Sequence, residues 1–198
     1  MACNLTKGRT LSCTQAIGGI KKVYFTTWSK ALWDSTVTFN IADVYQIDSL
    51  PTMDVVQYDC RPNLSQMTIT TANGDATAGT PAFYDQACDV VLQKIDVASL
   101  PYLKEVGDSR VVAMVLDMND RVWVLGLKYG ARVTGGTIVT GTARGDMSGM
   151  TISISAQEEE PLYGLKFDAN ATERTLNYPW TGLSTPGNVT VLGMVTPT

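Results

Sequence analysis

The sequence between residues 110 and 160 constrains the fold most, because extended runs follow one another there with only short polar breaks. Residues 111–118 are nearly all apolar, which predicts a strand buried on both faces. Residues 151–157 alternate between apolar and polar side chains, which is the period-two pattern of a half-buried strand. We therefore expect an antiparallel meander over residues 110–160 that forms one rigid sheet.

Short polar or glycine-containing breaks separate these runs. Asn119 and Asp120 form a two-residue break of the kind that turns a hairpin. The signal is weaker than Asn-Gly, because Asp120 tolerates a positive φ less well than glycine does. Gly130 and residues 145–149 are expected to turn the chain again.

Extended patterns also occur outside this stretch. Residues 42–50 fit either a strand or a turn of helix, and Pro51 ends them. Further strands are predicted over residues 20–28, 37–41, 55–61, 65–71, 80–95 and 189–195.

One helix is predicted, over residues 97–106. Ser99 can cap it, Pro101 suits its first turn, and apolar residues recur every three positions. Gly107 is expected to end it. Because the helix is short, its stability must come from packing on a sheet.

These patterns predict a mainly β protein, an antiparallel β-sandwich or barrel with one short flanking α-helix. Nothing in the sequence indicates a second domain, so residues 1–198 are expected to form one domain. Residues 1–19 are polar and glycine-punctuated and predict an N-terminal arm. Residues from about 167 to 198 lose periodicity and predict a C-terminal arm.

Composition narrows the classes of partner. The net charge is −4, and only 17% of residues are charged, against about 25% in an average protein. The surface is therefore either rich in uncharged polar residues or largely hidden in contacts. The lack of a basic stripe argues against nucleic-acid binding. No apolar run reaches about 18 residues, so no membrane insertion is expected. The first residues lack the apolar core of a signal peptide, which predicts a cytoplasm-like compartment.

The chain contains no histidine. This removes the Ser-His and Cys-His dyads, the usual zinc sites and the commonest general base. Carboxylate or lysine chemistry remains open, but no spacing indicates it. We therefore predict no catalytic residue, no cofactor, no metal site and no enzymatic activity. The four cysteines are widely spaced and are interpreted as free thiols.

Two further sets of residues are candidates for contacts. Glu158, Glu159 and Glu160 form a run of like charge that is either a solvated strand end or an acidic patch facing a polyanion or a basic partner. The solvated end is the favoured interpretation. Trp28 and Trp180 lie near predicted arms and loops, and they are candidate anchors between subunits.

Several motifs resemble those of a known family, the major tail tube proteins of siphophage-like tailed bacteriophages, particularly those of Bacteroidetes hosts. The opening MACNLTKG and the later GGIKKVYFT are similar to the start of those proteins, and the resemblance covers about residues 1–28 and 80–165. Asp120 stands where glycine is usual, and the residues after Lys166 have no counterpart. The matching positions are Asp117, Asn119, Trp123, Gly126 and Gly130, then Thr140, Gly141, Ala143, Gly145, Asp146, Gly149 and Ile152, then Glu158 and Pro161.

The resemblance implies a non-enzymatic virion protein, assembled in the host cytoplasm. Six copies would form a ring, and stacked rings would form the tail tube that conducts DNA into the host without binding it specifically. The implied partners are the chain itself, the tape-measure protein, and the tail terminator and distal tail proteins. Net acidity suits a DNA conduit, because like charge discourages sticking.

Within this interpretation, the small and polar loop over residues 72–79 is expected to make contacts between rings, with Asn73, Gly74 and Asp75 as candidates. The glutamate run at 158–160 would then be an acidic lumen or rim. Two alternatives from other classes remain. One is a carbohydrate-binding or adhesion β-sandwich on a virion or cell surface, and the other is a histidine-free enzyme that uses paired carboxylates.

Overall fold

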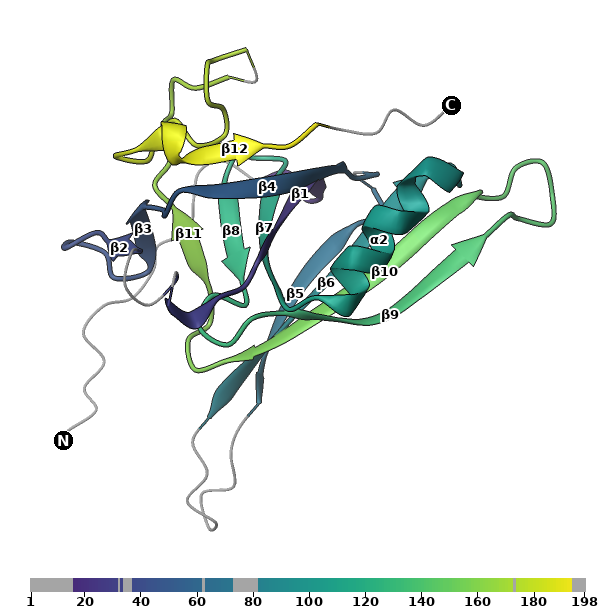
Figure 1. The fold of residues 1–198 in the computed structure, drawn as a ribbon, viewed down its shortest axis with the longest axis horizontal. Helices are drawn as coiled ribbons and strands as arrows, with labels where there is room; N and C mark the ends of the chain where they lie inside the picture. Colours follow the sequence, from purple (N-terminus) through teal and green to yellow (C-terminus); the bar gives the residue numbers. More distant parts are fainter. Residues whose placement is uncertain are drawn as a thin grey trace, which may run out of the picture.

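The computed structural model describes residues 16–193 except residues 32, 34–36, 62, 73–81 and 173. It contains two β-sheets with a helical segment beside them (Figure 1), which confirms the expectation of a mainly β protein with a short helix. The eight-stranded sheet has the spatial order β12 (Val189–Val191), β4 (Met53–Asp59), β1 (Ile20–Thr27), β7 (Val111–Asp117), β8 (Val122–Leu125), β11 (Tyr163–Leu165), β3 (Gln46–Ser49) and β2 (Thr38–Phe39). The four-stranded sheet has the order β5 (Gln66–Ala72), β6 (Phe83–Gln93), β10 (Gly149–Glu158) and β9 (Arg132–Val139).

Strand β7 lies in the middle of the eight-stranded sheet, between β1 and β8. Every residue from 111 to 116 is buried, which confirms the prediction of a strand covered on both faces. Alternate residues of β7 belong to two different hydrophobic clusters, one on each side of the sheet. The continuous apolar run in the sequence therefore reflects a strand with packing on both sides.

The four-stranded sheet is covered on one face only. In β10 the side chains of Ile152, Ile154 and Ala156 are buried, and their neighbours in the strand are more exposed. This confirms the predicted alternation. The buried face shares a hydrophobic cluster with one face of the eight-stranded sheet and with the helical segment.

The prediction that residues 110–160 form one antiparallel sheet is wrong, because their strands are divided between the two sheets. Strands β7 and β8 pair in the eight-stranded sheet, whereas β9 and β10 pair in the four-stranded sheet. The chain crosses over at residues 126–131, where Gly126 and Gly130 both adopt positive φ, +69° and +77°. A side chain at either position would clash with neighbouring atoms at under 3 Å, so both turns depend on glycine.

Two strand pairings are parallel, which corrects the expectation of an antiparallel fold. Strand β11 pairs in parallel with β3, and β12 pairs in parallel with β4. Both pairings join segments far apart in the sequence, and an alternating pattern carries no information on strand direction. Neither sheet closes on itself within the described residues, so the barrel alternative does not describe the single chain.

The C-terminal segment is part of the core in the range that the structure describes. Trp180 is 1% exposed, and its ring packs edge-on against Tyr24 at 5.0 Å between centroids. Leu183 and Val189 join the same cluster, on the face of the eight-stranded sheet opposite the four-stranded sheet. The expected C-terminal arm is corrected accordingly: residues up to 193 turn irregularly, but they cover a sheet face that would otherwise be exposed.

The helical segment comprises η1 (Val97–Ser99) and α2 (Leu100–Asp108). Pro101 lies in the first turn, as predicted, but Ser99 makes no side-chain cap and its hydroxyl donates to Asp96 at 3.1 Å. Gly107 does not end the helix, because a glycine inside a helix costs only about 1 kcal/mol relative to alanine. Buried Val106 holds this turn against the core instead.

The strand pairing also decides the predictions for three short segments. Residues 42–50 contain strand β3 rather than a turn of helix, and the strand predicted over residues 37–41 is limited to β2. The predicted strand over residues 189–195 is observed as β12 within the described residues, and residues 194 and 195 lie outside them.

Candidate assembly surfaces

The outer face of the four-stranded sheet is polar and faces away from the core. Its only charged residues in the described strands are Asp85, Asp89 and Arg132. Asp89 accepts hydrogen bonds from Gln66 of β5 at 3.2 Å and from Ser153 of β10 at 2.6 Å, so it links three neighbouring strands. The register also places three large apolar residues on this face, Phe83, Val91 and Val139. The uncharged polar members of this face are Gln66, Thr68, Thr70, Gln93, Thr137, Thr151, Ser153, Ser155 and Gln157.

Both edges of the same sheet are unpaired among the described residues. Strand β5 has no charged residue, and β9 has only Arg132 at its start. Residues 134–139 of β9 are all exposed, including Ile138 and Val139. Natural sheets usually protect such edges with lysine, proline or a covering segment. Among the described residues, neither strand contains a lysine or a proline, and α2 contacts β9 without pairing with it. Both edges are therefore suited to pairing with another strand.

Strand β5 leads into β6 at one end of the four-stranded sheet, and β9 leads into β10 at the other end (Figure 1). The register places Tyr84, at the start of β6, opposite Glu158, and Gln93, at its end, opposite Gly149. The β9–β10 loop is held by the Asp146 carboxylate, which accepts from the backbone N–H of Thr142 at 2.8 Å and of Ala143 at 2.7 Å. The candidate contacts Asn73, Gly74 and Asp75 lie in the β5–β6 loop, outside the described residues.

Glu158 is a buried structural residue, which corrects its assignment to an acidic lumen or rim. It is 3% exposed, and its carboxylate accepts from the backbone N–H of Lys128 at 3.1 Å and of Tyr129 at 3.0 Å. Burial raises the pKa of Glu158, while these two N–H donors act in the opposite direction. The carboxylate thus fixes the crossover between the sheets.

Glu159 and Glu160 are engaged at the same end of β10. Glu159 is bonded to the Lys128 ammonium and to the Tyr129 hydroxyl, and these contacts lower the pKa of Glu159. Glu160 accepts from the hydroxyl of Tyr45 at 2.8 Å. The sequence run of three carboxylates therefore contains one buried residue and two partnered surface residues, and the acidic residues missed in the sequence are Asp85 and Asp89.

The two tryptophan candidates differ in accessibility. Trp180 is a core residue and is not available to another subunit. Trp28 is half-buried, donates its indole N–H to the carbonyl of Leu127 at 3.2 Å, and is covered by Arg110 at 4.9 Å from the ring centroid. Its role as an anchor stays a prediction.

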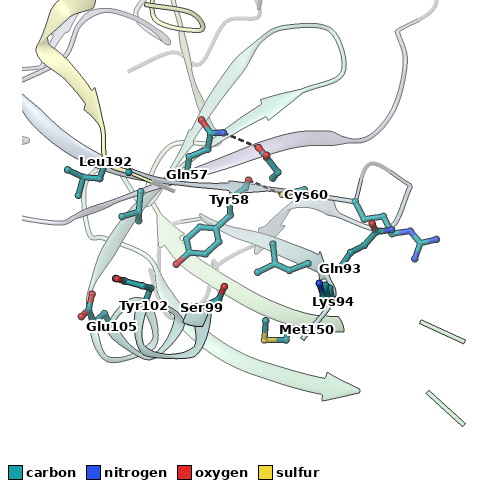
Figure 2. A pocket seen from close by; sticks show the side chains of 15 residues that line it. Gln57, Tyr58, Cys60, Gln93, Lys94, Ser99, Tyr102, Glu105, Met150 and Leu192 are labelled. Carbon is teal, nitrogen blue, oxygen red and sulfur yellow. Dashed lines mark hydrogen bonds between the residues drawn. The ribbon is translucent and has the colours of Figure 1, made fainter. Parts of the chain in front are cut away.

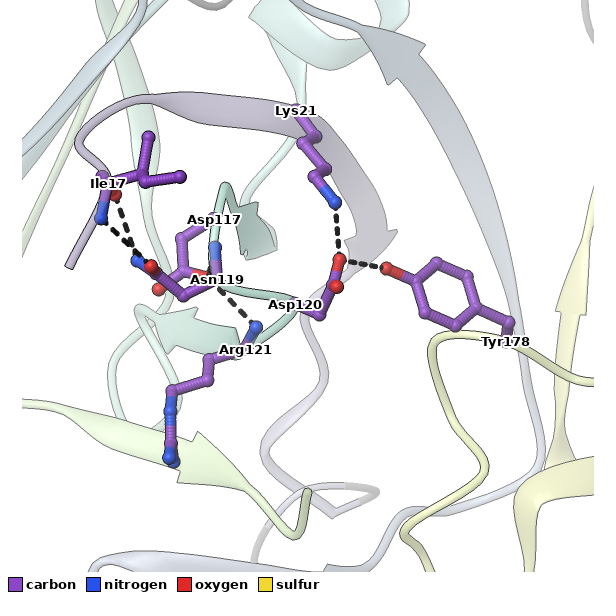
Figure 3. A network of polar contacts seen from close by, with 7 residues as sticks. All are labelled: Ile17, Lys21, Asp117, Asn119, Asp120, Arg121 and Tyr178. Carbon is purple, nitrogen blue, oxygen red and sulfur yellow. Dashed lines mark hydrogen bonds and ion pairs between the residues drawn. The ribbon is translucent and has the colours of Figure 1, made fainter. Parts of the chain in front are cut away.

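A polar cluster at the β7–β8 turn connects Ile17 and Lys21, near the start of the described residues, with Tyr178 in the C-terminal segment (Figure 3). Asp120, at φ +61°, accepts from the Lys21 ammonium and from the Tyr178 hydroxyl at 2.6 Å. Burial alone would raise the pKa of Asp120, but these two donors outweigh it and hold the pKa below its ordinary value. The adjacent Asn119 exchanges hydrogen bonds with the backbone of Ile17 at 3.0 and 2.9 Å. Asp120 thus closes the β7–β8 turn.

A groove runs between β4 and α2 (Figure 2). Its volume is about 450 Å³, and its walls include Tyr58, Tyr102, Met150 and Leu192. Cys60 also lines it, and burial raises the pKa of this thiol to about 12. The thiol is therefore protonated at neutral pH and is a poor nucleophile.

The described part of the chain contains no cluster of three or more potential metal-ligating side chains. None of its helices has the length and apolar character needed to cross a bilayer. Comparison with protein families, with curated proteins and with solved structures found no match.

Proposed function

We propose that this chain is the structural subunit of a phage tail tube, in which copies join side by side through β5 and β9. The proposal rests on the family resemblance and on one structural observation: the four-stranded sheet has a polar open face and two unprotected edges. A sheet with two such edges is suited to extension by identical copies, and ring closure removes every free edge.

The strand directions permit this junction. The four strands alternate in direction, so β5 and β9 run in opposite directions. Rotation about an axis roughly parallel to the strands preserves direction, and β9 of one copy would therefore meet β5 of the next in antiparallel fashion. The eight-stranded sheet covers the apolar face and would lie outside, which leaves the polar face to line the channel.

The lining proposed here suits DNA passage. Threonine, serine and glutamine side chains dominate it, and Asp85 and Asp89 outnumber Arg132. A neutral to acidic wall repels phosphates and offers them few cationic partners. This agrees with a conduit that passes DNA without binding it, around a tape-measure protein, with terminator and distal tail proteins at the tube ends.

The two hairpin loops would connect successive rings. They leave opposite ends of the four-stranded sheet, so the β9–β10 loop of one ring would face the β5–β6 loop of the next. Asn73, Gly74 and Asp75 remain the candidate contacts in the second loop.

The test is electron microscopy of concentrated protein carrying Ile138→Lys in β9, compared with the wild type. Ile138 is exposed, so the charge should alter stability by less than about 0.5 kcal/mol but should block edge pairing and abolish tubes. Val97→Lys, at an exposed apolar site on the helical segment, is the matched control and should assemble normally. A wild type that stays monomeric, or an Ile138→Lys variant that still forms tubes of the wild-type diameter, would refute the proposal.

A further inference from the structure

The groove between β4 and α2 is an apolar cleft that the described residues leave open. A second cavity of about 430 Å³ adjoins it and shares Val56, Tyr58, Tyr102, Glu105 and Leu192 with it. An engineered cavity of about 150 Å³ holds a benzene molecule, so the groove has room for several side chains. Tyr102 and Leu192 are also partly exposed at its mouth (Figure 2).

The same molecule carries an apolar protrusion, the turn between β2 and β3. Ile41 is fully exposed and Val44 is 65% exposed. Hydrogen bonds within the turn fix its shape: the Asn40 side chain accepts from Ala42 N–H at 2.8 Å, and the Asp43 carboxylate accepts from Tyr45 N–H at 3.1 Å. The tip is therefore preorganised, with two aliphatic side chains held in water. Such exposure marks an interaction site when the apolar residues are adjacent.

The charges of the two surfaces are complementary. Asp43 is the only charged residue between positions 38 and 47. Arg61 and Lys94 line one end of the groove, and neither forms an ion pair with any residue that the structure describes. Two carboxylates also line the groove: Asp59, which faces Lys22 at 3.8 Å, and Glu105, which lies on α2 away from Lys94 (Figure 2). An incoming Asp43 would thus meet Arg61 and Lys94 at the end of the groove away from Glu105.

We infer that the β2–β3 turn of one copy docks into the β4–α2 groove of a second copy. The two features lie in different parts of the molecule (Figure 1), so a copy cannot fill its own groove with its own turn. The contact is heterologous, with different surfaces on the two partners, and such contacts build rings or filaments rather than closed dimers. It adds a second junction to the strand pairing proposed above and does not depend on it.

A mixing experiment tests the contact separately from strand pairing. Both variants are made in the Ile138→Lys background, so that β9 cannot pair. Ile41→Asp disables the turn and Tyr102→Glu disables the groove, and circular dichroism checks that both fold. Each variant alone should be monomeric by analytical ultracentrifugation. An equimolar mixture should form heterodimers, because one intact turn and one intact groove remain.

Two outcomes would overturn the inference. One is a mixture that stays monomeric while both variants are folded, and the other is an Ile41→Asp variant that self-associates as strongly as its parent. If the wild type forms tubes and the mixture does not associate, only this inference fails. If the mixture associates and the wild type forms no tube, only the tail-tube proposal fails.

A covalent test uses Val44→Cys in one chain and Leu192→Cys in another, with Cys3 and Cys13 replaced by serine. Oxidised glutathione should link the two chains to each other, and neither chain alone should form a disulfide dimer. Asp43→Lys added to the first chain should reduce the yield of mixed dimer at low salt, because it places a third cation near Arg61 and Lys94. Equal yields of same-chain and mixed dimers would contradict the docking geometry.

Discussion

The two sheets differ in what covers them. The eight-stranded sheet is packed on both faces, by the four-stranded sheet and helix on one side and by irregular segments, including residues 180–189, on the other. The four-stranded sheet is packed on one face and has one polar face and two free edges among the described residues. The first sheet therefore supplies most of the buried apolar area that stabilises the subunit, and the second keeps the surfaces that can meet other copies.

The largest effect should come from uncovering the far face of the eight-stranded sheet. Trp180→Ala removes a buried ring that packs on Tyr24. We expect a loss of about 3–5 kcal/mol in the free energy of unfolding, which is typical of a large buried aromatic. Urea denaturation followed by circular dichroism measures it.

The control lies in the same irregular segment. Leu176 is 84% exposed, and Leu176→Ala should change stability by less than about 0.5 kcal/mol. Similar small effects for both variants would mean that the C-terminal segment does not cover the sheet, and the contrast between the two sheets would then disappear.

The second effect concerns the crossover that joins the sheets. Glu158→Gln keeps the shape of the side chain, but it makes Oε1, which accepts from both Lys128 and Tyr129, part of a neutral amide and replaces Oε2, 3.3 Å from the Lys128 nitrogen, by an NH₂ group. Weakening two hydrogen bonds to a charged acceptor and placing a donor beside a buried N–H costs about 1–3 kcal/mol. We expect a loss in that range at pH 7, measured by the same urea titration. Glu160→Gln, at a partly exposed site, is the control with a smaller loss.

The pH dependence of this variant has a defined sign. Burial raises the pKa of Glu158 above the value of about 4.3 found in unfolded chains. The folded state therefore binds the Glu158 proton more tightly than the unfolded chain does. The stability that comes from this difference is fully present below the unfolded pKa and is lost as the pH rises through the raised pKa of the folded state. The advantage of the wild type over Glu158→Gln should shrink between pH 4 and neutral pH. An advantage that grows instead would show that the two N–H donors outweigh burial.

The sequence predicted the strands well where burial alone determined the pattern. The apolar run at residues 111–118 and the alternation at residues 151–157 each identify a strand and the faces it buries. The position of the crossover was not predictable, because Gly126 and Gly130 look like ordinary hairpin breaks in the sequence. Only three-dimensional packing decides whether such a break reverses the chain within one sheet or passes it to another.

The candidate site was harder to predict for two physical reasons. A carboxylate run usually solvates a surface, and nothing local indicates that Glu158 accepts backbone N–H groups from residues about 30 positions away. The core role of Trp180 was hidden because residues 167–193 pack as turns, without the period of a helix or strand. The two aspartates of the polar face, Asp85 and Asp89, carried a usable signal, since they occupy alternate positions in β6.

A smaller effect is expected at the rim of the eight-stranded sheet. Tyr178→Phe removes the hydroxyl that donates to Asp120 at 2.6 Å. The loss should be about 0.5–1.5 kcal/mol, the net value of one hydrogen bond. Tyr129→Phe removes an exposed contact to Glu159, which follows the C-terminal end of β10, and it should lower the free energy of unfolding by a smaller amount. A larger loss of stability for Tyr129→Phe than for Tyr178→Phe would mean that the more important polar contact lies beside the four-stranded sheet. The contrast between a stabilising eight-stranded sheet and an open four-stranded sheet would then be weaker.

The smallest effect should occur in the β9–β10 loop, which projects from the four-stranded sheet. The backbone N–H groups of Ala143 and Thr142, together with the Thr142 hydroxyl, hold the pKa of Asp146 below its ordinary value. The stabilising contribution of this carboxylate is therefore present above the unfolded value of about 3.9 and is lost as the pH falls through the lowered pKa.

Because the loop is exposed, Asp146→Asn should leave global unfolding nearly unchanged and should act locally. In the wild type, the backbone amide proton shifts of Thr142 and Ala143 should titrate together, with a midpoint below about 3.9. In Asp146→Asn this titration should disappear while the shifts of β7 stay the same. A midpoint at or above the ordinary aspartate value would mean that the loop is not held by this carboxylate. A large loss of global stability would mean that the loop belongs to the packed core, and the division between a covered sheet and an open one would not extend to its hairpin.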